Sequence, residues 1–337
     1  MLQPEQQPTN HLEAPPPALD ATPHPTAPEP RSPLGPLTHL VLYALLVATA
    51  WFIEQVVLSQ WLQHLSTTVD GVLRLTPYLA VAAFNLAALF AITLFMAMLE
   101  DRGVGDYGLG GFHALRRFFT GAAWGILAIS TLILTLHSLH LLVFQARLDR
   151  GPSILGWGLA QLSLFLLVGI FEEYFFRGYL QFTLTRALTR TFARTNVLLS
   201  PTRARTIAFW IAALITSTFF LYAHSRNPGE DPVGLLLIFL AGTVFVLALW
   251  RTGSLWWAIG FHAAWDWSQS FLFGVPDSGG LIQGRLFATH TAGNPLLSGG
   301  TAGPEGSLLC IPIFLLVILI LFFYTQPKLR HLDRSEA

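Results

Sequence analysis

Charged residues and cysteine are both scarce in this sequence, and each scarcity excludes a class of protein. Only 11% of the 337 residues are charged, whereas 53% are hydrophobic and the mean hydropathy is +0.54. Soluble globular domains carry about 25% charged residues, so this composition indicates a membrane protein. The single cysteine, Cys310, excludes an intramolecular disulfide, and we interpret it as a small buried apolar side chain.

Proline, in contrast, is concentrated near the N-terminus. Residues 1–36 are rich in proline and carry almost no large apolar side chains, which predicts a disordered cytoplasmic tail. A removable signal peptide has a basic start followed directly by a short apolar core and a small-residue cleavage site. The tail lacks this succession, so we expect no removable signal peptide. We interpret residues 37–325 as a transmembrane bundle with a motif-bearing core at about 150–275, and residues 326–337 as a short polar C-terminal tail.

Eight apolar stretches follow the tail, most of them close to the ~20 residues that a spanning helix needs. They lie near residues 37–58, 78–99, 119–144, 153–188, 206–224, 233–250, 254–273 and 307–324. The sequence therefore predicts an all-α fold, a polytopic membrane helix bundle with about eight transmembrane helices. An even number of spans places both termini on the same side of the membrane.

Basic residues are divided unevenly between the two sides of this predicted bundle. One side collects fourteen of the nineteen, namely Arg31, Arg102, Arg116, Arg117, Arg177, Arg186, Arg190, Arg194, Arg203, Arg205, Arg251, Lys328, Arg330 and Arg334. The other side has the remaining five, which are Arg74, Arg147, Arg150, Arg226 and Arg285. Lys and Arg favour the cytoplasmic side, so both termini are predicted to be cytoplasmic.

The stretch Phe171–Gln181, FEEYFFRGYLQ, places two carboxylates and an arginine inside a segment that is otherwise apolar from Ser153 onward. Ionisable groups at membrane depth are costly unless they pair or face water. On a helix, Glu173 and Arg177 lie on one face as an ion pair, whereas Glu172 points about 100° away and is the free carboxylate. On this stretch alone, a structural ion pair that joins two helices and a chemical site are equally good interpretations.

Two later stretches carry polar groups that could face Glu172. His224 ends the fifth stretch, with Phe220 on the same helical face, and His262 and Asp266 lie four residues apart inside the seventh. Ionisable side chains within spans are rare and commonly functional. A glutamate, two histidines and a second carboxylate are the groups that hydrolytic enzymes use to activate water, either directly or through a divalent metal.

The depth of these residues restricts how they can meet. The fourth stretch holds 36 residues, roughly 54 Å of helix against a hydrocarbon core of ~30 Å. If it started at Ser153 and crossed directly, Glu172 would lie near the cytoplasmic end, whereas His224 closes the fifth stretch at the opposite end. We therefore predict that the fourth helix extends well into the cytoplasm and that Glu172 lies near mid-depth. A shared site requires Glu172 and His224 to lie within about 10 Å of each other.

The remaining polar features are interpreted as ordinary interfacial or loop residues. They are Glu54, Asn85, His137, His140, His290 and Glu305. Residues 110–119 predict either a short amphipathic surface helix or a plain loop. The Gly/Pro-rich connection 274–306 falls on the outer side and is long for a loop, which predicts a functional cover or a disordered segment.

In its ordered set of motifs, the sequence resembles the CAAX protease and bacteriocin-processing family of intramembrane endopeptidases, which includes the type II CAAX prenyl proteases and many bacterial immunity-type proteins. The motifs are a paired glutamate followed by arginine, a phenylalanine four residues before a histidine, and a histidine four residues before an asparagine or aspartate. In this sequence they are Glu172, Glu173 and Arg177; Phe220 and His224; and His262 and Asp266. The resemblance covers roughly residues 75–275.

The resemblance implies a role for each residue of these motifs. Glu172 would act as general base on the attacking water, with His224 helping to hold that water, while Glu173 and Arg177 would orient the site. His262 and Asp266 would stabilise the oxyanion or complete a metal ligand set of Glu172, His224, His262 and Asp266. Asp266 replaces the asparagine of the eukaryotic-type prenyl proteases, and this departure tilts the expectation towards a divalent metal, zinc. A metal-free glutamate mechanism is the alternative.

We therefore expect an intramembrane endopeptidase that hydrolyses a membrane-tethered peptide or protein. Its partners would be that substrate and the lipid bilayer, without nucleic acid, and we expect a multi-pass protein of a bacterial inner membrane. The alternatives are an inactive relative that acts as a membrane scaffold or immunity protein, and an ion-coupled transporter. The absence of an internal repeat of the polar motifs disfavours the transporter.

Overall fold

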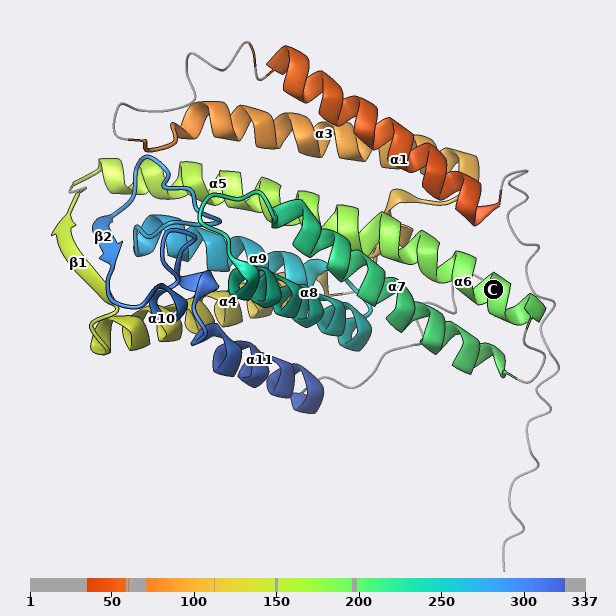
Figure 1. Ribbon diagram of the computed structural model, residues 1–337. Coiled ribbons are helices and arrows are strands. Elements are labelled where there is room, and N and C mark those ends of the chain that lie inside the picture. The colour runs from red at the N-terminus through yellow and green to blue at the C-terminus, as the bar shows by residue number, and fades with distance from the viewer. Residues whose placement is uncertain are drawn as a thin grey trace, which may run out of the picture.

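The computed structural model describes residues 35–58, 60, 71–111, 113–148, 151–195 and 199–324. Over these residues the protein is a bundle of long helices with one small sheet at one end (Figure 1). All-α architecture is thus confirmed for the bundle. Nearly all of the predicted N-terminal tail and the whole of the predicted C-terminal tail lie outside the described residues.

The helical elements follow the apolar stretches closely. The α-helices are α1 (Pro36–Ile53), α3 (Leu75–Glu100), α4 (Ala114–Ser138), α5 (Ser153–Glu173), α6 (Gln181–Thr195), α7 (Pro201–His224), α8 (Pro232–Thr252), α9 (Trp256–Trp267), α10 (Pro295–Ser298) and α11 (Cys310–Tyr324). The π-helical segments are η1 (Glu54–Leu58), η3 (Tyr174–Leu180) and η4 (Ser268–Leu272), and the 3-10 segments are η2 (Val104–Tyr107) and η5 (Pro304–Gly306). In the described chain, 6 helices are long and apolar enough to cross a membrane. The seventh and eighth predicted spans are shorter helices, α9 with η4 and α11.

The predicted third span is wrong at its outer end. The helix stops at Ser138, and His140 takes a left-handed backbone conformation with φ 58°, which terminates a helix. The chain then forms β1 (Leu142–Arg147), which pairs antiparallel with β2 (Phe287–Thr291). Residues 110–119 do not form a separate surface helix either, because α4 already begins at Ala114.

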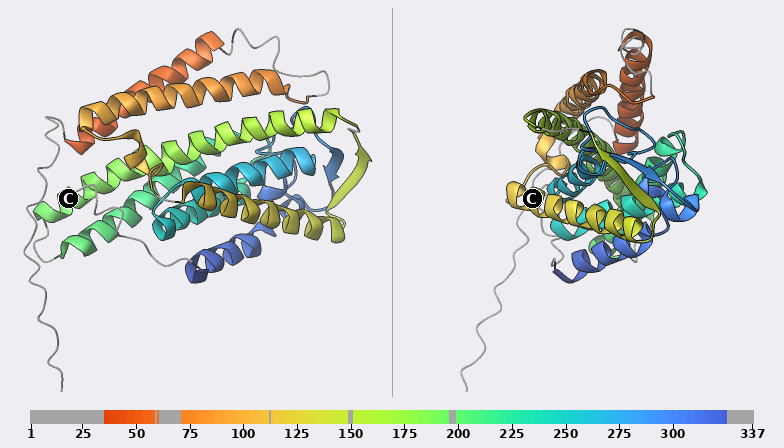
Figure 2. Two further views of the ribbon diagram at one scale, coloured as in Figure 1. Left: turned by 180° about the vertical axis from the view of Figure 1, so that it is seen from behind. Right: turned by 90° about the vertical axis from the view of Figure 1, so that its left-hand side faces the viewer.

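The predicted long fourth helix is confirmed. Elements α5, η3 and α6 form one continuous helix of 43 residues from Ser153 to Thr195, about 64 Å at 1.5 Å per residue. Its α6 end runs beside α7 and extends past most of the bundle, whereas the β1–β2 sheet lies at the opposite end (Figure 2). The bundle is therefore longer at the α6–α7 end, the end predicted to be cytoplasmic.

Helices α4 and α9 pack with their backbones in contact because glycines lie between them. A Cβ at Gly121 or Gly125 would lie 2.0 or 2.4 Å from a carbonyl oxygen of α9, and a Cβ at Gly260 would lie 2.1 Å from a carbonyl oxygen of α4. Small residues at a helix interface allow this close approach in membranes. The packing fixes α9, which carries His262, against the buried core.

Helices α1 and α3 lie beside α5 and α6 on one side of the bundle (Figures 1 and 2). At the α6 end they are fixed by Glu100 of α3, which is 2% exposed. Its carboxylate accepts hydrogen bonds from Tyr179 at 2.7 Å and Arg186 at 2.6 Å. A buried, multiply bonded carboxylate of this kind joins the elements that carry its partners.

Candidate functional site

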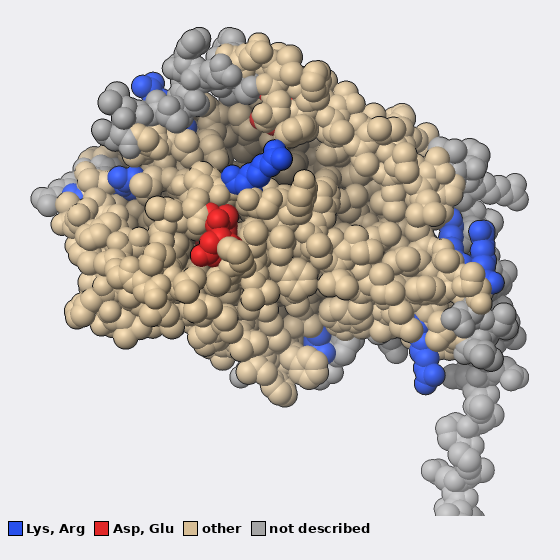
Figure 3. Space-filling view, viewed as in Figure 1, with Lys and Arg blue, Asp and Glu red and all other residues tan. Residues whose placement is uncertain are grey.

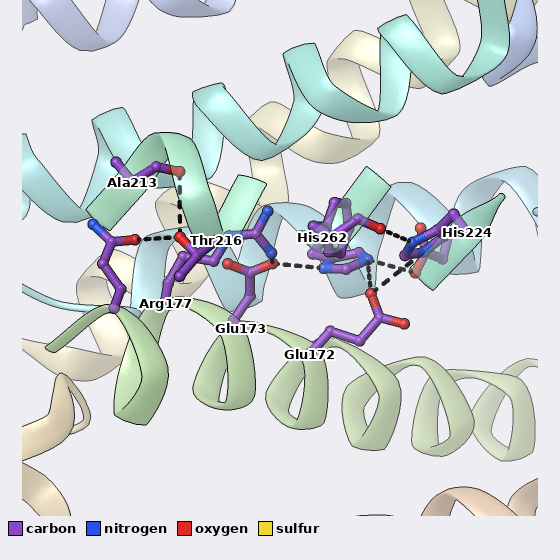
Figure 4. A network of polar contacts seen from close by, with 10 residues as sticks. Glu172, Glu173, Arg177, Ala213, Thr216, His224 and His262 are labelled. Atoms are coloured by element: carbon purple, nitrogen blue, oxygen red, sulfur yellow. Dashed lines mark hydrogen bonds and ion pairs between the residues drawn. The ribbon is translucent and has the colours of Figure 1, made fainter. Parts of the chain in front are cut away.

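The two adjacent glutamates lie in the last turn of α5, immediately before the π-helical segment η3. Their side chains have different surroundings, since that of Glu173 is 0% exposed and that of Glu172 is 19% exposed. Figure 4 shows Glu173 directed at Arg177 and His262, while Glu172 points towards His224 and His262. The structure thus agrees with the sequence-based prediction that Glu172 is the free carboxylate. Short π-helical segments are frequent at functional sites.

Glu173 lies at the centre of a buried polar chain. Its Oε1 accepts hydrogen bonds from Arg177 Nη1 at 3.0 Å and from His262 Nδ1 at 3.0 Å. The Arg177 guanidinium lies over the ring of Phe220 at 4.1 Å, a cation–π contact that stabilises a desolvated cation. Because Nδ1–H of His262 donates to Glu173, Nε2 of the same ring faces the cavity.

His224 reaches the same point from α7. Its Nδ1–H donates to the carbonyl oxygen of Phe220 at 2.7 Å, and the centroids of the His224 and Phe220 rings lie 4.4 Å apart. The Nε2 atoms of His224 and His262 both lie 3.8 Å from Oε2 of Glu172. The requirement for a shared site is therefore met, and Asp266 Oδ2 completes the group at 3.5 Å from His262 Nε2. All the site residues predicted from the sequence meet in one cluster.

The centre of this cluster holds acceptors that face one another. With both Nδ1–H groups engaged, the two Nε2 atoms of neutral imidazoles and the carboxylate oxygen of Glu172 are all acceptors. Glu172 Oε2 is buried and has no hydrogen-bond partner among the described residues. Buried polar atoms are usually satisfied by protein or by water. The gap of 3.8 Å to each imidazole suits a small donor molecule such as water.

The predicted metal ligands meet in this cluster, but their donor atoms lie farther apart than those around a bound zinc ion. Ligand atoms around a tetrahedral zinc ion with bonds of about 2.0–2.1 Å lie roughly 3.3 Å apart, and the separations of 3.5 and 3.8 Å here are wider. In the described part of the chain no group of three His, Cys, Asp or Glu side chains is placed to hold a metal ion. The donor types suit zinc, but their spacing does not, so no chemical step is derived through a metal.

A cavity of about 550 Å³ surrounds the cluster and is walled by α1, α3, α5, α7, α8, α9 and the connection 274–306. The face seen in Figure 3 is hollowed, with acidic and basic side chains beside the hollow. Five carboxylates line the cavity, namely Glu54, Glu172, Asp266, Asp277 and Glu305. The interpretation of Glu54 as an interfacial residue is therefore wrong, because its side chain lines the cavity and the residue is only 8% exposed.

The connection 274–306 is an ordered cover at the β1–β2 end of the cavity. Glu305 accepts a hydrogen bond from the Ser278 backbone N–H at 2.6 Å and another from the Gln269 side chain. Burial raises the pKa of Glu305 to about 7 and raises that of Asp277 well above its usual value. The interpretation of Glu305 as an ordinary loop residue is wrong. The sequence alone could not predict this position, because it depends on contacts between the connection and residues distant in sequence.

Two residues of α8 also escaped the sequence analysis. The ring of Phe245 stacks on His262 with centroids 5.0 Å apart, and Gly242 lies beside the guanidinium of Arg177. Helix α8 is apolar along most of its length, so neither residue stands out from its neighbours. The glycine within a long apolar helix was the only available indication.

Residues 154–268 match the family model described as type II CAAX prenyl endopeptidase Rce1-like. The matched range begins at the second residue of α5 and ends at the first residue of η4, so it includes every residue of the cluster. A search of curated proteins and a search of solved structures found no match. The family match agrees with the resemblance of the motifs.

Proposed function

Because residues 154–268 match the type II CAAX prenyl endopeptidase Rce1-like family model, we propose that the chain is an intramembrane endopeptidase that hydrolyses a peptide bond of a membrane-associated protein or peptide. The observation that carries this proposal is the position of Glu172 Oε2, which is buried, has no hydrogen-bond partner among the described residues and lies 3.8 Å from the Nε2 atoms of His224 and His262. A water at that point would contact a general base and two imidazoles at once.

In the proposed reaction, Glu172 removes a proton from the water, and Nε2 of His224 accepts the second hydrogen bond of that water. The oxygen attacks the carbonyl carbon of the scissile bond, and the proton held by Glu172 passes to the leaving amine. Charge that develops on the carbonyl oxygen would lie next to His262 and Asp266. The group that donates to this oxygen is His262 in its doubly protonated form or Asp266 in its neutral form.

Glu173 and Arg177 are positioning residues in this proposal. The Glu173 carboxylate holds Nδ1–H of His262, so that Nε2 points into the cavity. Arg177 neutralises Glu173 in a setting where both side chains are 0% exposed. Such an arrangement orients an imidazole in the way that carboxylates orient histidines in other catalytic sites.

The walls of the cavity fit a substrate that comes from the membrane. Aromatic side chains from α5, η3 and α7, including Phe171, Phe175 and Phe219, line it together with the polar cluster. A largely apolar segment beside one cleavable bond would match this lining. By the description of its family, a prenylated substrate is the first class to test, alongside the same peptide without the lipid.

A metal-assisted reaction stays a prediction for this site. The residues proposed to hold zinc are Glu172, His224, His262 and Asp266, and the ion would polarise the scissile carbonyl or activate the water. Chelation of the purified protein tests this directly. We expect cleavage to continue without metal, because the donor separations of 3.5 and 3.8 Å are wider than those around a bound zinc ion.

The test is cleavage of a membrane-tethered reporter library by detergent-purified protein. Glu172→Gln and His262→Ala should abolish cleavage, while His140→Ala, a histidine substitution outside the cluster, should leave it unchanged. Cleavage that persists in both site variants would place the activity elsewhere. No cleavage by any form, prenylated reporters included, would contradict the protease proposal and favour the scaffold or transporter hypothesis.

A further inference from the structure

Helix α8 contributes an aromatic face to the site, although it carries none of the site motifs. Phe245 is 4% exposed. Its ring lies parallel to the His262 imidazole, with centroids 5.0 Å apart and an interplanar angle of 16°. The Arg177 guanidinium carbon lies 5.3 Å from the centroid of the same ring. Phe245 therefore contacts both ends of the chain that Glu173 joins.

Gly242 lies one helical turn before Phe245, on the same face of α8. A Cβ at this position would lie 2.9 Å from Arg177 Nη2 and 3.4 Å from Ser217 Oγ. Arg177 is 1% exposed and fixed to Glu173 at 3.0 Å, so the guanidinium has little free space into which it can move. Any larger side chain at 242 must displace Arg177 or push α8 away from it.

The hydrogen bond to Glu173 fixes only one edge of the His262 ring. An imidazole held by a single hydrogen bond can still tilt about it, and small misplacements of a reacting group are costly to the rate. A parallel ring packed against one face removes that freedom. The structure gives this task to Phe245, because it is the ring stacked on His262 among the described residues.

We propose that Gly242 and Phe245 of α8 are positioning residues of the hydrolytic site, an inference that rests on the proposed function. Phe245 sets the plane of His262, and Gly242 leaves the space that Arg177 occupies. Neither residue carries a group that can take part in the proton transfers. Their effect passes through His262 and Arg177, so it should appear in turnover and in the state of the imidazole more than in substrate affinity.

The first experiment compares Phe245→Leu with Phe209→Leu, which removes a second buried phenylalanine. Phe209 is also 4% exposed but packs on Trp250, away from the cluster. Phe245→Leu should lower kcat about tenfold to a hundredfold, with KM within roughly twofold, while Phe209→Leu keeps wild-type kcat at a similar loss of thermal stability. Phe245→Tyr, which keeps the aromatic face, should restore most of the turnover.

The second experiment needs no substrate. In ¹⁵N-histidine NMR spectra of the purified protein, the ring protons of His262 should show the upfield ring-current shift of a stacked aromatic ring, and its nitrogens should report a single tautomer protonated at Nδ1. Phe245→Leu should remove the upfield shift and mix the tautomers, and Phe209→Leu should change neither.

Gly242→Ala and Gly156→Ala form the matched pair for the glycine. An added Cβ at Gly156, in α5, meets no atom within 4 Å, so that variant should behave as wild type. Gly242→Ala should lower kcat as Phe245→Leu does. Unchanged turnover and an unchanged His262 spectrum in Phe245→Leu would overturn the inference. Cleavage that survives Glu172→Gln would instead overturn the proposed function and leave the NMR comparison to decide the stacking.

Discussion

Removing the charge of Arg177 should destabilise the protein far more than removing any exposed arginine. Arg177 and Glu173 form an ion pair of 3.0 Å in which both side chains are 0% exposed. Breaking a fully buried pair costs about 3–5 kcal/mol, because the remaining charge stays desolvated and unpaired. Arg177→Met keeps most of the side-chain volume, so the loss should report the charge and not a cavity.

A double-mutant cycle separates the interaction energy of the Glu173–Arg177 pair from the separate effects of the two substitutions. Glu173→Gln should also destabilise by a few kcal/mol, since it leaves the Arg177 cation without a carboxylate. The double variant Glu173→Gln/Arg177→Met has no stranded charge, so it should be more stable than the sum of the single variants by roughly 1–3 kcal/mol. Cleavage should not recover in the double variant, because His262 has still lost the carboxylate that accepts from Nδ1.

The measurement is equilibrium unfolding in mixed detergent micelles, with reporter cleavage on the same samples. Arg226→Met is the control, because Arg226 is exposed in the connection between α7 and α8, and surface substitutions usually change stability by less than about 0.5 kcal/mol. Additive losses in the cycle, or a loss for Arg177→Met no larger than that for Arg226→Met, would refute the buried-pair reasoning.

Three further predictions concern the outer connection, the α4–α9 contact and the metal. Burial raises the pKa of Glu230 to about 7, from an ordinary value of 4.5. A carboxyl with a raised folded-state pKa costs stability as the pH rises from its unfolded to its folded value. Glu230→Gln should therefore have a higher Tm than wild type above pH 7, with no difference near pH 4; equal Tm values at both would contradict this. Gly125→Ala places a Cβ 2.4 Å from the Phe261 carbonyl oxygen, so it should cost about 1–3 kcal/mol by overpacking and lower kcat by moving α9, as thermal unfolding and reporter kinetics would show. Dialysis against a chelator should leave reporter cleavage intact, whereas activity lost on chelation and restored by zinc would establish the metal mechanism.

Much of the bundle could be predicted because the bilayer imposes a length on every apolar segment. The apolar stretch 153–188 is too long for one perpendicular crossing, which predicted a long helix, and the structure has one of 43 residues from Ser153 to Thr195. The end of α4 could not be predicted in the same way. Residues 142–144 are apolar enough to continue a span, and they form the start of strand β1 because β2, about 140 residues later, supplies the partner.

The polar part of the site could be predicted because charged groups are rare in spans. Glu173, Arg177 and His262 stood out against apolar neighbours, and the four-residue spacings predicted which of them share a helical face. Phe245 could not be found on these grounds. Its place beside His262 depends on how α8 packs against α9, and one phenylalanine in an apolar helix has the same appearance as any other.

The π-helical segment η3 lies between two parts of one long helix, one that carries the site glutamates and one that contacts Glu100 of α3. In a regular α-helix, the number of residues between two side chains fixes the angle between the directions in which they point. Without the π-helical segment, the position of the site residues would therefore fix the direction of the side chains that contact Glu100. The wider turn at Tyr174–Leu180 changes that angle locally, which lets Glu172 face the cavity while Tyr179 and Arg186 face α3. The π-helical segment thus sets the rotation of the site residues relative to the side chains that contact Glu100. Deleting one residue within it should turn the site and its anchorage out of alignment even though every side chain of both is still present.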